Sequence, residues 1–248
     1  MGSKVLVTGG SGFLGKRLAL VEPSWTYLSS KDIDLENYDS CLEFFGDNKP
    51  DAIIHLAGRV GGIKDNVEKP AEFYYRNVTM NTNVIHAAYK AGVDRVLSAL
   101  STCAFPDNLD RYPFREEDLH RGPPAPTNLP YGFSKRALHV QSMAYREQCG
   151  VNYSSFSLSN LYGPEDNFDP ETSHFVPSLL RRISESEEHE TLSLWGSGKP
   201  MRQQLYVDDA ARIIPVLLEK HNGDTPIIVA PNENLTIKQM AVYVIKAL

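Results

Sequence analysis

The chain has 248 residues, of which 42% are hydrophobic and 23% charged, with 17 Gly, 16 Pro and 3 Cys. This composition excludes a disordered chain, a collagen and a disulfide scaffold, and the length fits one large α/β unit or such a unit with a small appendage. The net charge of −6, the scattered basic residues and the absence of a long apolar run make nucleic acid and membrane unexpected partners.

Short apolar runs alternate with helical stretches along the first two thirds of the chain. The runs cover residues 4–8, 26–29, 52–57, 95–100 and 153–158, and helices are expected over 13–20 and 77–91, the second ending at Gly92. Strands that are apolar throughout and alternate with helices are typical of a parallel sheet covered on both faces. We therefore predict an α/β fold with a Rossmann-type, doubly wound parallel sheet.

The alternation of apolar strands and helices ends at about Tyr162. A Pro- and Asp-rich loop leads to an amphipathic helix over 176–183, and a later helix over 209–220 has Asp208 or Asp209 as its expected N-cap. The segment after Tyr162 looks like an insertion outside the sheet, and we expect it to form a smaller α/β subdomain.

A glycine-rich turn follows the first predicted strand directly. It reads Gly9, Gly10, Ser11, Gly12, Phe13, Leu14, Gly15. Glycines at this spacing between a strand and a helix allow a sharp turn, close approach to a pyrophosphate and tight helix packing. We therefore predict a dinucleotide site at the start of the first helix.

The end of the second strand bears on the choice of dinucleotide. Ser29, Ser30 and Lys31 stand where an acidic residue would grip the ribose of NAD, so hydroxyls and a cation favour the 2′-phosphate of NADP(H). The alternative for Lys31 is a solvated surface lysine. Asp34 and Leu35 follow and are expected to cover the adenine.

Tyr131 and Lys135 are four residues apart and are expected on one helical face. The ammonium should lower the pKa of the phenol and make it a usable acid or base, although such a pair can also be a surface pair. Ser101 and Cys103 follow the strand over 95–100, and along an extended segment they would point to the same side. A hydroxyl, a phenol and an ammonium beside a nicotinamide suit carbonyl reduction.

These motifs together resemble the extended short-chain dehydrogenase/reductase family. Within it, the chain is similar to enzymes that convert GDP-4-dehydro-6-deoxy-D-mannose into GDP-L-fucose by 3,5-epimerisation and NADPH-dependent 4-reduction. The distinguishing marks are Val60-Gly61-Gly62-Ile63, Ser101-Thr102-Cys103, and Asp166-Asn167-Phe168 followed by His174.

The resemblance implies a role for each residue of the predicted site. Cys103 is the base and His174 the acid of both epimerisations, and Ser101, Tyr131 and Lys135 stabilise the C4 oxyanion before Tyr131 protonates it. Without the resemblance, Cys103 would more often be a small buried hydrophobe and His174 a structural histidine.

The resemblance also implies binding residues, partners and a domain division. Further cofactor contacts are Leu56, Ala57, Leu100, Thr102, Leu158, Asn160, Leu161 and His174. The GDP-linked 4-keto-6-deoxy sugar contacts Asn160, Val176, Arg182, Trp195 and Arg202.

The resemblance also implies a domain division. The NADP-binding domain comprises 1–160 and 203–229 and the substrate subdomain 161–202 and 230–248, which we expect to continue beyond residue 248. A homodimer with a four-helix contact, free thiols, no metal and a cytoplasmic location are further expectations.

Two other functions stay open from the residues alone. One is a nucleotide-sugar epimerase or dehydratase with tightly bound NAD(P), and the other is a non-catalytic NADP-binding protein. The complete set of Ser101, Tyr131 and Lys135 argues against a mere binder, because binding a dinucleotide does not need it.

Overall fold

A computed structural model describes residues 3–187, 191–194 and 196–247. Its central sheet consists of six parallel strands in the order β2-β1-β3-β4-β5-β9. The strands are β1 (Val5–Thr8), β2 (Thr26–Leu28), β3 (Ala52–His55), β4 (Arg95–Ala99), β5 (Asn152–Leu158) and β9 (Ile227–Val229). The strand order reverses between β1 and β3, and such a reversal opens a ligand crevice at the carboxyl ends of the strands.

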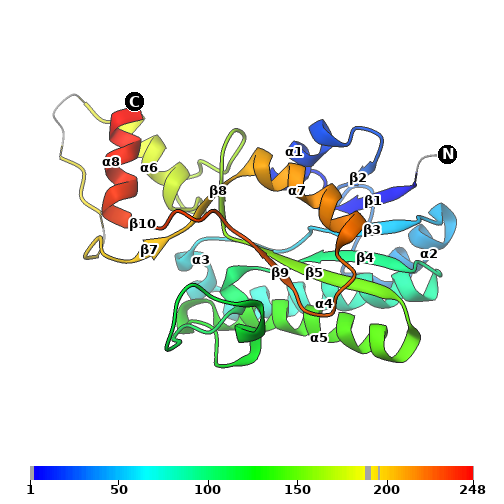
Figure 1. The fold of residues 1–248 in the computed structure, drawn as a ribbon. Helices are drawn as coiled ribbons and strands as arrows, with labels where there is room; N and C mark the ends of the chain where they lie inside the picture. Colours follow the sequence, from blue (N-terminus) through cyan, green and yellow to red (C-terminus); the bar gives the residue numbers. More distant parts are fainter. Residues whose placement is uncertain (1–2, 188–190, 195, 248) are drawn as a thin grey trace.

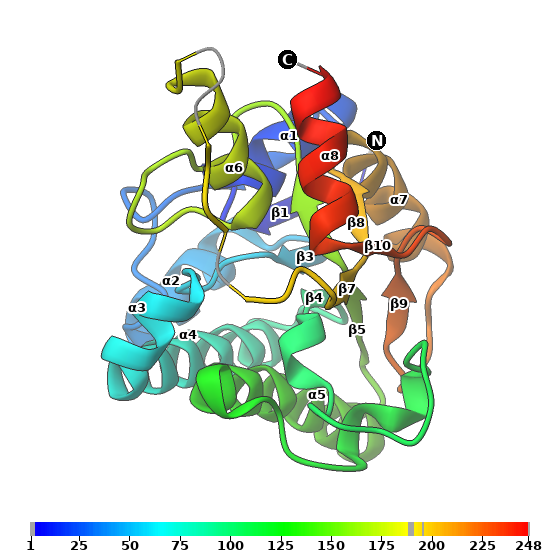
Figure 2. The same ribbon diagram turned by 90° about the vertical axis from the view of Figure 1, so that its left-hand side faces the viewer.

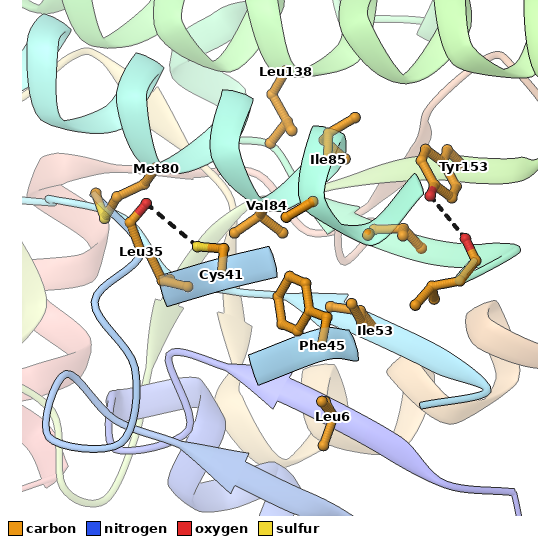
Figure 3. Close-up of a cluster of buried hydrophobic side chains, with 14 of the residues drawn as sticks. Leu6, Leu35, Cys41, Phe45, Ile53, Met80, Val84, Ile85, Leu138 and Tyr153 are labelled. Atoms are coloured by element: carbon orange, nitrogen blue, oxygen red, sulfur yellow. Dashed lines mark hydrogen bonds between the residues drawn. The ribbon is translucent and has the colours of Figure 1, made fainter. Parts of the chain in front are cut away.

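Helices cover both faces of the sheet, as Figure 1 shows. On one face lie α1 (Phe13–Val21) and α7 (Val207–Lys220), and on the other α2 (Tyr38–Asn48), α4 (Pro70–Lys90) and α5 (Leu129–Cys149). Successive strand residues point to opposite faces, so Leu6 joins the core beneath α2 and α4 whereas Val5 and Val7 join the core beneath α1 and α7. Figure 3 shows the first of these cores, where Ile53 of the sheet meets side chains of α2, α4 and α5. The predicted doubly wound α/β fold is confirmed.

Smaller elements lie beyond the carboxyl ends of the central strands. They are α3 (Ile63–Glu68), 3₁₀ turns at Thr102–Ala104, Glu116–His120 and Pro126–Asn128, β6 (Asn160–Tyr162) paired with β8 (Gln204–Tyr206), and β7 (Met201–Arg202) paired with β10 (Leu235–Thr236). Two helices, α6 (Phe175–Ser184) and α8 (Ile237–Ala247), pack side by side away from the large sheet (Figures 1 and 2). Within the described ranges, no helix combines the length and apolarity needed to span a bilayer.

The predicted elements differ from the structure mainly at their ends. The five predicted strands are present, but the helix expected over 77–91 begins at Pro70, which has the fixed φ that suits a first helical residue. Gly92 follows that helix with a φ of +76°, as its predicted stop signal requires.

The N-cap predicted for α7 is wrong. Tyr206 occupies the N-cap position, and both predicted caps, Asp208 and Asp209, lie inside the first turn. Asp208 instead binds the Arg17 guanidinium through two hydrogen bonds of 2.6 and 2.9 Å, which join α7 to α1. Its carboxylate serves a contact between helices that are far apart in sequence, and no local pattern reveals such a contact.

Candidate functional site

The glycine-rich turn has the shape that a pyrophosphate needs. Gly9 has a φ of +74°, and a Cβ there would lie 2.7 Å from the backbone nitrogen of Ala57. Gly12 is the N-cap of α1 and offers no side-chain acceptor, so the first N–H groups of α1, beginning at Phe13, are left without a side-chain cap. Free N–H groups at the positive end of a helix form a binding site for an anion, and the turn therefore fits a dinucleotide phosphate.

Predicted cofactor residues surround this turn. Leu56 and Ala57 follow β3 and approach Gly9, whereas Leu100 follows β4 and is buried. Leu158 ends β5, and Asn160 and Leu161 begin β6 at the same edge of the sheet. The predicted contacts thus gather at the carboxyl ends of the strands.

The loop after β2 offers exposed polar groups at the place predicted for the 2′-phosphate. Ser30 and Lys31 are exposed, while the Ser29 hydroxyl donates to Asp32 at 2.6 Å. Asp34 is exposed, whereas the Leu35 side chain belongs to the core cluster and is 9% exposed.

Tyr131 and Lys135 lie on the first two turns of α5, as predicted. Lys135 Nζ donates to the carbonyl oxygen of Ala99 at 3.0 Å, which fixes it at the end of β4. The Tyr131 ring packs edge-on against Phe73 of α4, with ring centroids 6.3 Å apart. Lys135 is therefore held at the end of β4, and Tyr131 packs against a buried ring of α4.

The predicted extended conformation of Ser101 to Cys103 is wrong. β4 ends at Ala99, and Thr102–Ala104 forms a 3₁₀ turn in which the Ser101 hydroxyl accepts the N–H of Cys103 at 3.2 Å. The turn still brings Ser101 and Cys103 together. Gly132 makes this possible, because a Cβ at that position of α5 would collide with the carbonyl oxygen of Cys103.

Burial governs the protonation of the two helix residues. It raises the pKa of Tyr131 well above its ordinary value, reinforced by Cys103 and opposed by a hydrogen bond with Ser101, and it lowers the pKa of Lys135 to about 8. The predicted lowering of the Tyr131 pKa by Lys135 is therefore wrong. Tyr131 is a neutral phenol at pH 7 and can donate a proton.

Cys103 must lose its proton and become a thiolate if it is to act as a base. Burial raises the pKa of its thiol, while the Ser101 hydrogen bond and the positive charge of Arg202 lower it. Arg202 thus lies within electrostatic reach of Cys103, although it is exposed and its guanidinium donates to the neighbouring carbonyl of Met201.

His174 belongs to a segment outside the central sheet. It is the exposed N-cap residue of α6, and the preceding Ser173 carbonyl would lie 3.5 Å from a Cβ at Gly62. Four residues earlier, a Cβ at Gly58 would lie 3.4 Å from Lys135 Nζ, so the segment from Gly58 to Gly62 approaches both α5 and the residues before α6.

The remaining predicted substrate residues are spread over the small elements. Val176 is buried in α6, the exposed Arg182 donates to the Ser193 carbonyl at 2.8 Å, and Asn160 is exposed in β6. Trp195 lies outside the described residues.

Sequence reasoning missed a buried polar chain beneath the site. His55 is completely buried between Thr8 at 2.7 Å and Asn81 at 3.0 Å, and Asn81 donates to the Ser134 carbonyl of α5. Burial first, and then the charge of Lys135, lower the pKa of His55 to about 3, so its imidazole is neutral. The sequence signal for this chain was His55, a polar residue within the otherwise apolar strand β3.

Comparisons with known proteins agree with this geometry. The sequence profile of the NAD dependent epimerase/dehydratase family matches residues 5–230. A probable GDP-L-fucose synthase of Drosophila melanogaster is 37% identical, with the match covering 98% of this chain and 81% of that protein. The GDP-L-fucose synthase of Dictyostelium discoideum is 35% identical over 92% of this chain and 74% of its own length.

A solved structure is similarly close. The GDP-L-fucose synthetase of Naegleria fowleri bound to NADP superposes with a TM-score of 0.90 at 36% identity, covering 99% of this chain and 77% of that one. The resemblance inferred from the motifs is thereby confirmed at the level of the family.

Proposed function

This chain belongs to the NAD dependent epimerase/dehydratase family, and from that premise we propose that it is a GDP-L-fucose synthase using NADP(H). The observation that carries the proposal is the gathering of Ser101, Cys103, Tyr131 and Lys135 at the end of β4. They lie at the same edge of the sheet as the glycine-rich turn. The substrate is GDP-4-dehydro-6-deoxy-D-mannose and the product is GDP-L-fucose.

The chain's residues fit NADP(H). The N–H groups of α1 and the turn from Gly9 to Gly15 would hold the pyrophosphate, and Ser30 and Lys31 would meet the 2′-phosphate. When bound, NADPH supplies the hydride that C4 of the sugar receives.

Epimerisation needs groups on both faces of the sugar. The C4 ketone makes the protons at C3 and C5 removable, and Cys103 takes each proton to leave an enolate. His174 returns a proton to the opposite face, which inverts the carbon. Ser101, Tyr131 and the Lys135 ammonium hold the negative oxygen at C4 during both steps.

Reduction uses the same oxygen-binding groups. Tyr131 is a neutral phenol, so it gives its proton to the C4 oxygen as the carbon is reduced. Lys135 lies one turn further along α5, where its positive charge stabilises the phenolate that remains.

The small elements serve the nucleotide half of the substrate in this proposal. We assign 161–202 and 230–248 to a substrate-binding subdomain and the rest to the NADP-binding domain. We assign Arg182 and Arg202 to the diphosphate, for which guanidinium groups are well suited. We also propose a cytoplasmic location.

A homodimer is part of the proposal. Large apolar side chains on neighbouring helices α4 and α5 are exposed, with Tyr74 at 47%, Phe133 at 41% and Val140 at 51%. They border a groove of about 670 Å³ that lies between the two helices. A second copy would cover this face through a four-helix contact.

An assay of NADPH oxidation tests the proposed function. Addition of GDP-4-dehydro-6-deoxy-D-mannose to the protein and NADPH should consume NADPH and yield GDP-L-fucose, whereas a UDP-linked 4-keto sugar should react far more slowly. A keto sugar that remains unchanged would contradict the proposal.

A further inference from the structure

The carboxylate of Asp166 has an oxygen that is shielded from solvent and lacks a partner. Asp166 follows β6, and its Oδ1 accepts the backbone N–H of Asn167 at 2.7 Å. Its Oδ2 is buried and makes no hydrogen bond to any part of the chain that the structure describes. A buried polar atom without a partner is uncommon and calls for an explanation, such as a role in function.

His174 interacts electrostatically with the carboxylate of Asp166. Burial raises the pKa of Asp166, while the backbone hydrogen bond of Asn167 and the charge of His174 lower it. The imidazole of His174 is also free, since it makes no hydrogen bond with the described residues, and it is exposed at the start of α6. A carboxylate with one unpartnered oxygen and an imidazole without a hydrogen-bond partner among the described residues therefore lie within electrostatic reach of each other.

Ion pairs fix the segment between these residues at both ends. Glu165 pairs with Lys16 at 3.4 Å and with Arg17 at 3.6 Å, and both cations belong to α1. Near the other end, Glu171 pairs with Lys64 of α3. The residue next to Asp166 is thus tied to the cofactor-binding helix, whereas the exposed His174 side chain makes no hydrogen bond with the described residues.

We infer that Asp166 is the positioning residue for His174: its buried Oδ2 accepts one N–H of the imidazole and turns the other ring nitrogen toward the sugar. The inference rests on the proposed function, in which His174 is the acid of epimerisation. During that step the bond between the outer ring nitrogen and its proton breaks, and a C–H bond forms with the electron pair of the enolate. Asp166 remains a carboxylate throughout, and solvent restores the proton of His174.

Orientation explains why the acid needs such a partner. An imidazole that samples several rotamers spends little time with its proton aimed at the carbon, and misplaced acids lose much of the advantage of proximity. Hydrogen bonds of this kind are commonly open without ligand and close when the substrate binds.

The test separates proton removal from inversion. The keto sugar nucleotide is incubated with enzyme in D₂O, deuterium uptake at C3 and C5 is followed by NMR, and aliquots are then reduced with NADPH to count inverted carbons. Asp166→Asn should slow inversion by about tenfold or more, as expected when an acid loses the group that orients it. Uptake at C3 should stay within about twofold of wild type, because Cys103 still removes and returns protons on its own face.

Three reference variants show what loss of the base, loss of the acid and an unrelated change in the same loop each do to deuterium uptake and inversion. Cys103→Ser should lose both uptake and inversion, and His174→Gln should lose inversion at least as severely as Asp166→Asn. Asp169→Asn is the matched control, because Asp169 lies in the same loop and, among the described residues, its side chain accepts hydrogen bonds from the N–H groups of Glu171 and Thr172 and from the Thr172 hydroxyl. It should behave like wild type.

Several outcomes would overturn the inference. Inversion by Asp166→Asn at the wild-type rate would refute it, and so would equal losses of uptake, inversion and reduction, which indicate a structural role. If Asp166→Asn does not fold, Asp166→Glu decides, because a retained carboxylate should preserve part of the inversion and its complete loss would contradict the inference. Failure of the wild-type enzyme to epimerise would instead refute the proposed function.

Discussion

Lys135 and Tyr131 show how burial, and not the neighbouring charge, sets the protonation of single residues in this site. Each is almost completely enclosed, and each pKa moves in the direction that favours the neutral form. At neutral pH the phenol is protonated and the amine is still largely charged, because its pKa is about 8. This combination suits a proton donor next to a fixed positive charge.

The pH dependence of reduction follows from the lowered pKa of Lys135. The amine carries its charge below a pH of about 8 and loses it above, so kcat for reduction should fall as pH rises through that value. Lys135→Met should reduce slowly and show no such limb, because it has no proton to lose there. A profile of the wild-type reduction step that stays flat to pH 10 would contradict this assignment.

Single residues differ in how well the sequence predicts them. The sequence places Tyr131 and Lys135 correctly, because a spacing of four is a local property of a helix. The proximity of Cys103 to Ser101 is also correct, although the reason was a 3₁₀ turn and not an extended strand. Neither the raised pKa of Tyr131 nor the neutral His55 could be predicted, because both depend on neighbours brought by other elements.

At the scale of elements, the junction of β1 and α1 depends on the absence of a side chain at Gly15. A Cβ there would lie 2.7 Å from the Cα of Gly10 and would also collide with the Gly9 carbonyl. The helix can approach the turn only because these contacts are missing, and its free N–H groups are thereby brought to the phosphate site.

Gly15→Ala should therefore push α1 away from the turn. We expect a loss of about 1–3 kcal/mol in the free energy of unfolding, typical of overpacking, and a marked weakening of NADP⁺ binding measured by calorimetry. Gly46→Ala is the matched control, because Gly46 lies in α2 with no atom within 4 Å of its added Cβ. Unchanged NADP⁺ affinity in Gly15→Ala would contradict the role given to this glycine.

Strands within the regular alternation of the first two thirds were predictable, and isolated short ones were not. The five strands of that part were found, β2 among them although it has only three residues, but the equally short β9 lies outside that alternation and was missed. The pairs β6 with β8 and β7 with β10 are equally short and are defined by partners distant in sequence. The same reason explains the mistaken cap of α7, since Asp208 is held by Arg17 of α1.

At the scale of the whole molecule, large apolar side chains of the neighbouring helices α4 and α5 are left exposed by the single chain. The sequence indicated this exposed apolar face, because both helices look more apolar than burial on one side requires. The structure shows which side chains are exposed, and the partner itself remains a proposal.

A charge in this face should prevent the proposed assembly. Phe133→Glu places a carboxylate on the exposed side of α5, where dimerisation would have to bury it, so we expect the dissociation constant to rise at least about tenfold. Val216→Glu is the control, because Val216 is 50% exposed on α7, on the opposite face of the sheet. In analytical ultracentrifugation, Phe133→Glu should be monomeric, whereas the wild type and Val216→Glu should be dimeric. A wild-type protein that is itself monomeric would refute the dimer.

The central claim is that one crevice inverts C3 and C5 and reduces C4 of the same sugar. The most direct measurement is the NMR spectrum of the product made in D₂O with unlabelled NADPH. GDP-L-fucose with deuterium at C3 and C5 and protium at C4 is the predicted result, because solvent supplies the protons of epimerisation and NADPH supplies the hydride. A reduced product that retains protium at C3 and C5, or that carries deuterium at C4, would contradict the account.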